Sequence, residues 1–292
     1  MQHLEILQEL PNLRRPVLVA AFEGWNDAGE AASAAARALR RGLRTQAFAT
    51  LDPEEFFDFQ LVRPRARFTD DGRRAVDWPR TRLSWAPLPS ADRHVVVLDG
   101  PEPNLRWRTY TQVVTDLAVR LGVELAVTVG ALQVDVPHTR PVPLTASTVD
   151  PNLAADLGLA MSSYEGPTGI TGVLHEALSA RGIPAVSLWA GVPHYVAAAS
   201  YAPGALALAE RIGGLLGADL PLGALAGDAA GQAEDIAELV AEDDELADYI
   251  SELEERADAA ALAETELPAA TMSGDELAAE LERYLRDRGH PG

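Results

Sequence analysis

The sequence predicts an α/β protein: a mainly parallel sheet covered by helices on both faces, a three-layer αβα arrangement, with a C-terminal helical extension. Two observations lead to this fold class. Short apolar runs alternate with helical stretches over residues 17–216, which is typical of parallel strands joined by crossover helices. After residue 227 the composition turns acidic while apolar residues keep a helical spacing. We therefore expect one αβα core domain over residues 1–227 and helices beyond it.

The expected strands are short, continuous apolar runs bounded by turn residues, the pattern of strands buried on both faces. They lie at residues 17–22, 46–51, 94–98, 125–129 and 184–189. The expected helices lie at residues 28–41, 106–121, 170–181 and 204–216. Asp71-Gly72 between two short extended segments signals a turn. We expect an antiparallel hairpin to be inserted there, near residues 65–78.

The region after residue 227 is expected to form an acidic helical arm over residues 228–258, a linker over 259–272, and a last helix and tail over 273–292. A capping box at residues 273–276 opens that last helix. Five apolar residues of the arm follow a coiled-coil-like spacing. They are Ile236, Leu239, Leu246, Ile250 and Leu253. This seam suits packing on the chain's own body as well as contact with another copy.

Charge and composition exclude several classes of function. The formal net charge is −20, and residues 228–292 hold 20 acidic residues and 4 arginines, or −16, which leaves −4 for the body. No basic face for nucleic acid is expected. The chain has no cysteine and no lysine, so disulfides, thiolate catalysis, Walker A binding and Schiff-base chemistry are excluded. Without a membrane span or a signal-peptide pattern, we expect a cytoplasmic protein.

Polar clusters follow the expected strands or open the expected helices, and in an open α/β sheet such positions share one edge. Arg140 would be the anion donor there, and Glu102, His138 or His194 the acid–base groups. The full set of candidate ligand-binding residues is Asn26, Asp27, Glu102, His138, Arg140, Thr168, Gly169 and His194. The alternative is that they only cap helices and shape turns. No metal-ligand spacing, cofactor motif or nucleophile elbow occurs, so no metal or cofactor is expected and no catalytic residue is assigned.

Four motifs, taken in order, resemble the bacterial branch of the PAC2 family, the proteasome assembly chaperone 2 family. They are Phe-Glu-Gly-Trp-Asn-Asp-Ala-Gly at residues 22–29, Pro-His-Thr-Arg-Pro at 137–141, Tyr-Glu-Gly-Pro-Thr-Gly-Ile at 164–170 and Trp-Ala-Gly-Val-Pro-His-Tyr at 189–195. The resemblance implies an αβα fold similar to that of purine nucleoside phosphorylases, a ring-like homotrimer, and a role in assembling the proteasome ring.

Two functions remain open. The first is a non-enzymatic assembly chaperone or scaffold, whose partners are itself and proteasome components. The second is an enzyme or sensor that binds a small anionic or nucleoside-like ligand in a phosphorylase-like crevice. The second requires the candidate residues to converge on one pocket, whereas a chaperone has no such requirement.

Overall fold

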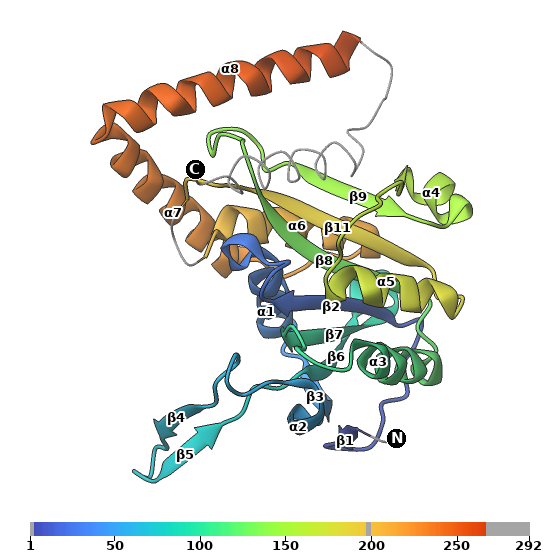
Figure 1. The fold of residues 1–292 in the computed structure, drawn as a ribbon. Coiled ribbons are helices and arrows are strands. Elements are labelled where there is room, and N and C mark those ends of the chain that lie inside the picture. Colours follow the sequence, from blue (N-terminus) through green and yellow to red (C-terminus); the bar gives the residue numbers. More distant parts are fainter. Residues whose placement is uncertain (1–2, 197–199, 267–292) are drawn as a thin grey trace.

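The computed structural model describes residues 3–196 and 200–266 and contains a nine-stranded sheet between two layers of helices (Figure 1). The strand order is β1-β3-β6-β7-β2-β8-β11-β9-β10. In that order, the strands are Leu4–Ile6, Gln46–Leu51, Arg82–Leu88, Arg93–Pro101, Val17–Glu23, Leu125–Val134, Ala185–Pro193, Leu144–Thr148 and Ala160–Met161. The central strands β7, β2, β8 and β11 are mutually parallel. β6 and β9 flank this parallel centre and run antiparallel to its outer strands, β7 and β11 respectively.

Strand β2 lies at the middle of the sheet and contributes to both hydrophobic cores. Because successive side chains of a strand point to opposite faces, Val17, Val19 and Ala21 enter one core, and Leu18, Ala20 and Phe22 the other. Helices α1 (Ala31–Gly42) and α6 (Ala202–Leu216) cover the first face. Helices α3 (Trp107–Leu121) and α5 (Ile170–Ala180) cover the second. The three-layer αβα fold is thus confirmed (Figure 1).

All five expected strands and all four expected helices are present, and four strands of the sheet were not expected: β1, β6, β9 and β10. The helix expected from residue 28 begins with a 3-10 turn, Ala28–Glu30, before α1. Gly29 and Glu30 both have positive φ angles, 57° and 50°, which interrupt a right-handed helix. Three short helices complete the body: α2 (Pro53–Phe56), the 3-10 turn Pro89–Ala91 and α4 (Pro151–Leu157).

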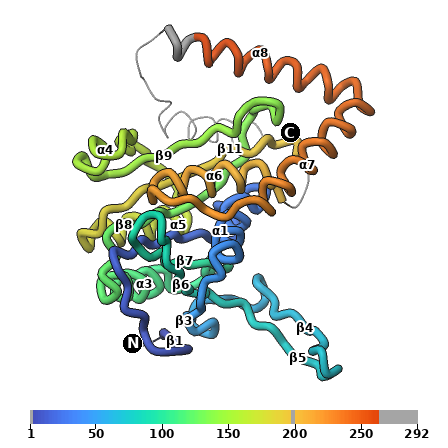
Figure 2. The backbone as a smooth tube through the Cα atoms, turned by 180° about the vertical axis from the view of Figure 1, so that it is seen from behind, coloured from blue at the N-terminus to red at the C-terminus, as the bar shows by residue number. Residues whose placement is uncertain are grey.

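A two-stranded antiparallel sheet separate from the main one is formed by β4 (Arg65–Phe68) and β5 (Arg74–Asp77). It stands where the Asp71-Gly72 turn predicts a hairpin. Figures 1 and 2 show it projecting from the body, at the end of the molecule opposite to α8.

The acidic region forms two helices, α7 (Gly223–Ala241) and α8 (Asp244–Glu266). The break between them is set by Asp243, whose carboxylate accepts a hydrogen bond from the Leu246 amide at 3.1 Å and so caps α8. Since α8 runs to Glu266, the linker expected over 259–272 is wrong for residues 259–266. Alanine, the strongest helix former, is frequent there. The helix expected over 273–292 lies outside the described residues.

The apolar seam of the arm is only partly covered by the chain itself. Ile236, Ile250 and Leu253 are buried, whereas Leu239 is 63% exposed. Among the described helices, none is both long and apolar enough to cross a membrane.

Candidate functional site

The loops that carry the candidate residues all lie at one edge of the sheet. Strands β2, β7, β8 and β11 are parallel, so their carboxyl ends share that edge. Asn26 and Asp27 follow β2, Glu102 follows β7, and the remaining strand-end candidates follow β8 and β11. Thr168 and Gly169 open α5 and reach the same edge through the contacts described next. At this edge the side chains form two separate groups.

The first group surrounds the amino end of α5. The Ile170 amide donates to Glu102 Oε1 at 3.0 Å, and Asn26 Nδ2 donates to Thr171 Oγ1 at 3.3 Å. Gly169 lets Asn26 approach closely, because an added Cβ would come 2.0 Å from Asn26 Nδ2 and would displace it. Thr168 packs with its hydroxyl over Gly172. The positive end of a helix favours an anion, and here the Glu102 carboxylate supplies it.

Asp27 serves the adjacent helix α1. Its Oδ1 accepts hydrogen bonds from the amides of Ala32, at 2.8 Å, and Ser33, at 3.0 Å, which are otherwise unpaired groups of the first turn. The residue is buried, and this burial raises the pKa of the carboxyl group. The geometry is that of a helix cap.

The second group is aromatic and lies between β8, β11 and α8. The Tyr195 hydroxyl accepts a hydrogen bond from the His138 amide at 2.6 Å and lies 2.8 Å from Nδ1 of the same residue. His194 Nδ1 lies 2.9 Å from Asp135 Oδ1, and its ring meets that of Tyr249 edge to face at 5.6 Å. Burial lowers the pKa of His138 and raises that of Tyr195 to about 12.

Arg140 is engaged by α8. Its Nε and Nη2 donate to the two carboxylate oxygens of Asp258 at 2.8 and 2.9 Å, and Nη1 donates to Glu254 at 3.3 Å. Thr139 also donates to Glu254. A bidentate arginine–carboxylate pair has strong directional preference. The guanidinium expected to receive an external anion therefore binds the chain's own carboxylates.

Sequence reasoning missed Tyr249, Glu254 and Asp258 as members of this edge, and it placed Tyr195 there without choosing it as a candidate residue. Glu254 and Asp258 are four positions apart, so they share one helix face, and Tyr249 is an isolated aromatic in an acidic helix. Those signals indicate a contact surface on α8 but do not identify what it contacts. Among the described residues, no group of three or more His, Asp or Glu side chains is arranged to hold a metal ion.

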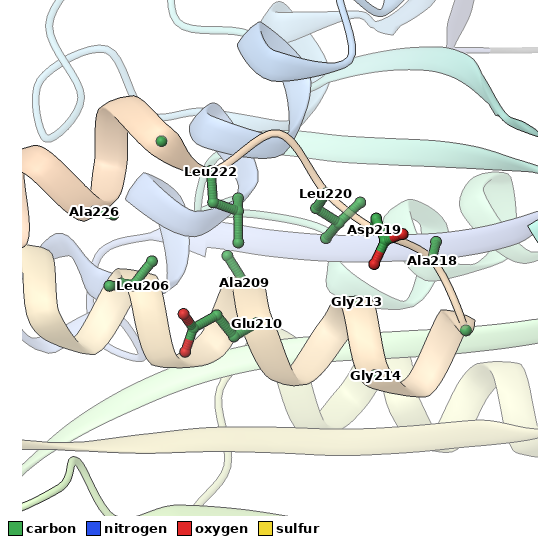
Figure 3. A pocket seen from close by; sticks show the side chains of 12 residues that line it. Leu206, Ala209, Glu210, Gly213, Gly214, Ala218, Asp219, Leu220, Leu222 and Ala226 are labelled. Atoms are coloured by element: carbon green, nitrogen blue, oxygen red, sulfur yellow. The ribbon is translucent and has the colours of Figure 1, made fainter. Parts of the chain in front are cut away.

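An open groove of about 570 Å³ lies elsewhere, between α6 and the start of α7. Figure 3 shows its small lining residues, Gly213, Gly214 and Ala226 among them, with the carboxylates of Glu210 and Asp219. None of the eight candidate residues lines it.

Comparisons with known proteins agree with this architecture. The family model for the PAC2 family matches residues 21–240. The crystal structure of a PAC2 family protein from Streptomyces avermitilis is 46% identical, covers 80% of this chain and 99% of that one, and has a TM-score of 0.75. A comparison with curated proteins gave no match.

Two structures from Mycobacterium tuberculosis are also similar. A proteasome-assembly chaperone homologue is 42% identical, with coverage of 80% of this chain and 99% of that one and a TM-score of 0.72. A protein of unknown function is 31% identical, with coverage of 90% and 91% and a TM-score of 0.81. The matched family model spans well over half of the sequence, and two of these relatives share more than 40% of their residues with it. The chain therefore belongs to the PAC2 family.

Proposed function

We propose that this protein is a non-enzymatic assembly chaperone or scaffold that forms a homo-oligomer, with a trimer favoured, and has proteasome-related protein partners. The observation that carries the proposal is the 42% identity to a proteasome-assembly chaperone homologue over 99% of that chain. The match extends over nearly the whole length of that chain, so it is not confined to one motif.

The geometry of the sheet edge supports a binding rather than a catalytic role. Glu102 occupies the amino end of α5, Asp27 caps α1, and Arg140 is held by two carboxylates of α8. A small anionic ligand would have to displace the Glu102 carboxylate and would not find Arg140 free. The alternative function, an enzyme or sensor with a phosphorylase-like crevice, requires the two groups of side chains to converge, and among the described residues no hydrogen bond or ion pair joins one group to the other.

The proposal is tested with unassembled proteasome α and β subunits from the source organism. Native gels and light scattering would follow the appearance of assembled particles with and without the protein, with an unrelated acidic protein of similar size as the control. We expect faster assembly, or a stable complex with one subunit type. An unchanged rate together with no complex would contradict the proposal.

The alternative function has its own measurement, thermal unfolding with phosphate and with nucleosides. The matched pair is the natural protein and Glu102→Gln, which removes the negative charge at the α5 terminus and keeps an oxygen acceptor. Binding of the ligand should raise the unfolding temperature. We expect no shift in either protein. A shift in the natural protein, larger in the variant, would favour the ligand-binding function.

Light scattering on the full chain tests the oligomer. A trimer of 31.1 kDa chains has a mass of about 93 kDa. If light scattering gives the mass of a single chain at all protein concentrations up to about 100 µM, any self-association has a dissociation constant well above the micromolar range. That result would remove the homo-oligomer from the proposal and leave the proteasome partner to be tested separately.

A further inference from the structure

The projecting hairpin formed by β4 and β5 has an apolar face that nothing in the described part of the chain covers. Ala66 pairs with Val76, and Phe68 pairs with Arg74, so these four side chains lie on one face. Phe68 is 74% exposed and Val76 is 49% exposed. A two-stranded hairpin is marginally stable in water without a packing partner. The exposed face therefore indicates a surface that becomes covered in an assembly.

The hairpin is also the basic part of an acidic protein. Residues 63–82 contain seven arginines and three aspartates, a net charge of +4 in a chain of net charge −20. Four of these arginines are exposed and make no ion pair with the residues that the structure describes: Arg63, Arg65, Arg74 and Arg80. A partner that covers the hairpin should therefore present carboxylates around an apolar centre.

The acidic helices α7 and α8 of the same sequence carry both carboxylates and an exposed apolar side chain. Residues 223–266, which form α7 and α8, contain 15 acidic residues and one arginine, a net charge of −14. Leu239 on α7 is 63% exposed, and the exposed carboxylates of Asp235 and Glu242 lie one helical turn before and after it. Neither residue makes an ion pair with another described residue.

The hairpin and α8 lie at opposite ends of one molecule in both views (Figures 1 and 2). Leu239 lies near the end of α7 that joins α8, toward the end of the molecule opposite to the hairpin, so two chains are needed to bring the two surfaces together. A contact between different surfaces of identical chains is heterologous, and it gives a closed ring when the rotation between subunits allows closure.

We propose that the β4–β5 hairpin of one copy docks on the acidic face around Leu239 of α7 in a second copy. Phe68 and Val76 pack on Leu239, and Arg74, which lies on the same face, pairs with Asp235 or Glu242. Arg65 lies on the opposite face and adds to the positive charge of the hairpin. This inference rests on the homo-oligomer of the proposed function and specifies the surfaces that form it. It does not depend on whether the assembled protein binds proteasome subunits.

Charge reversal with restoration tests the contact. The hairpin variant is Arg65→Glu with Arg74→Glu, and the arm variant is Asp235→Arg with Glu242→Arg. Each should weaken association about 10-fold or more, whereas the quadruple variant has the natural net charge and should assemble again. The matched control is Arg108→Glu with Arg120→Glu on α3, where both arginines are exposed and make no ion pair with any described residue. It changes the net charge as the hairpin variant does.

Light scattering and sedimentation of these proteins give distinguishable outcomes. Loss of the oligomer in the hairpin and arm variants, with recovery in the quadruple variant and no change in the control, supports the proposal. An oligomer that survives in the hairpin variant overturns it and leaves the homo-oligomer of the proposed function intact. A natural protein that is monomeric overturns both. In that case, loss of proteasome-subunit binding by the hairpin variant would assign the hairpin to that partner.

The absence of cysteine makes a direct distance test simple. One version of the protein carries Ala66→Cys on the hairpin. A second version carries Glu238→Cys beside Leu239 and a terminal tag, so that the two versions differ in mass on a gel. A short thiol-specific cross-linker should join the two chains when they are mixed. The control replaces Ala66→Cys by Ser90→Cys, an exposed position outside the hairpin. Equal cross-linking from both positions would contradict the proposed contact.

Discussion

Asp27 shows how a residue of a conspicuous loop motif acts through the backbone. Asp27 precedes α1, and its Oδ1 accepts hydrogen bonds from the Ala32 and Ser33 amides. The second carboxylate oxygen, Oδ2, is buried and has no hydrogen-bond partner among the described residues. The carboxylate therefore stabilises the helix start, and its negative charge is costly to bury. The two effects can be separated by substitution.

We predict that Asp27→Ala loses about 0.5–2 kcal/mol of unfolding free energy, the usual cost of removing a helix cap. Asp27→Asn keeps the acceptor oxygen without the buried charge and should be at least as stable as the natural protein at pH 7.

The difference between Asp27 and Asn should depend on pH. Burial raises the pKa of Asp27, so the stability that comes from the protonated carboxyl group is present at low pH and is lost as pH rises through the raised pKa. The advantage of Asn should therefore shrink on acidification. Urea unfolding at several pH values measures this, and equal losses for Ala and Asn would contradict it.

His138 gives a pH dependence of the opposite sign. Burial lowers its pKa, so the folded state favours the neutral ring. The associated stability is present above the ordinary histidine pKa and is lost as pH falls through the lowered value. Its neutral Nδ1 faces the Tyr195 hydroxyl.

We predict that the unfolding free energy of the natural protein falls between pH 7.5 and 5.5, and that His138→Gln makes this fall shallower by at most about 1.4 kcal/mol per pH unit, the maximum for one proton. The fall should not disappear, because burial also lowers the pKa of His175. Denaturant unfolding at constant ionic strength provides the curves. Identical slopes for the two proteins would exclude His138 as the titrating group.

At the scale of elements, α8 is attached to the β8–β9 connection by polar contacts and by its own buried side chains. Arg140 binds Glu254 and Asp258, and Ile250 and Leu253 are 4% and 1% exposed. An exposed ion pair contributes about 0.2–1 kcal/mol, whereas a fully buried Leu or Ile contributes about 1.5–3 kcal/mol. The apolar pair should therefore hold the helix in place, and the arginine should fix its register.

We predict that Arg140→Ala leaves the global unfolding free energy nearly unchanged, because the ion pair is exposed to solvent, and speeds amide hydrogen exchange in α8. Arg181→Ala is the matched control, because Arg181 pairs with Asp116 at 2.8 Å with a similar exposure, 40% against 35%. It should leave α8 unchanged. Equal exchange of α8 in both variants would mean that Arg140 does not hold it.

The elements also show what the sequence could and could not predict. Strands β2, β7, β8 and β11 were predictable because each is a continuous apolar run in the middle of the sheet. Strands β1 and β10 have only three and two residues, and their pairing depends on neighbours distant in sequence rather than on their own composition. The linker prediction failed where alanine-rich sequence continues α8.

The sheet edge was predictable from chain order, since the carboxyl ends of parallel strands coincide. The division of its side chains into two groups was not. Arg140 could be assigned to an external anion or to an internal carboxylate with equal justification, because its partners lie 114 and 118 residues further along the chain. The position of α8 is a tertiary fact that local patterns do not contain. The ligand-binding role of the eight residues stays a prediction.

At the scale of the whole molecule, the hairpin is separate from the structure that holds the chain together. No described residue between 57 and 82 belongs to either hydrophobic core. Arg65 and Asp77 lie opposite each other in the two strands at the base of the hairpin. The two ends of the hairpin are therefore close together, and a short linker can join them.

We predict that replacing residues 65–77 by a two-residue Gly-Ser linker changes the unfolding free energy of the body by less than about 1 kcal/mol, because closing so short a loop costs little, while it abolishes the homo-oligomer. Circular dichroism during urea unfolding and light scattering measure the two effects. The matched control is Asp70→Asn at the hairpin tip, an exposed residue without an ion pair among the described residues, which should change neither one appreciably. A loss of several kcal/mol after the replacement would show that the hairpin supports the fold instead.

The position of β2 has a consequence for the way the chain is made. This strand, which is buried from Val17 to Phe22, needs β7 on one side and β8 on the other. The ribosome completes β8 only about 110 residues later, roughly 5 to 22 seconds at ordinary elongation rates. Both edges of this apolar strand are open until β7 is complete at residue 101, and the edge that pairs with β8 stays open until residue 134. The order of the strands along the chain thus leaves a backbone edge of an apolar strand of the nascent protein unpaired until most of the sheet has been synthesised.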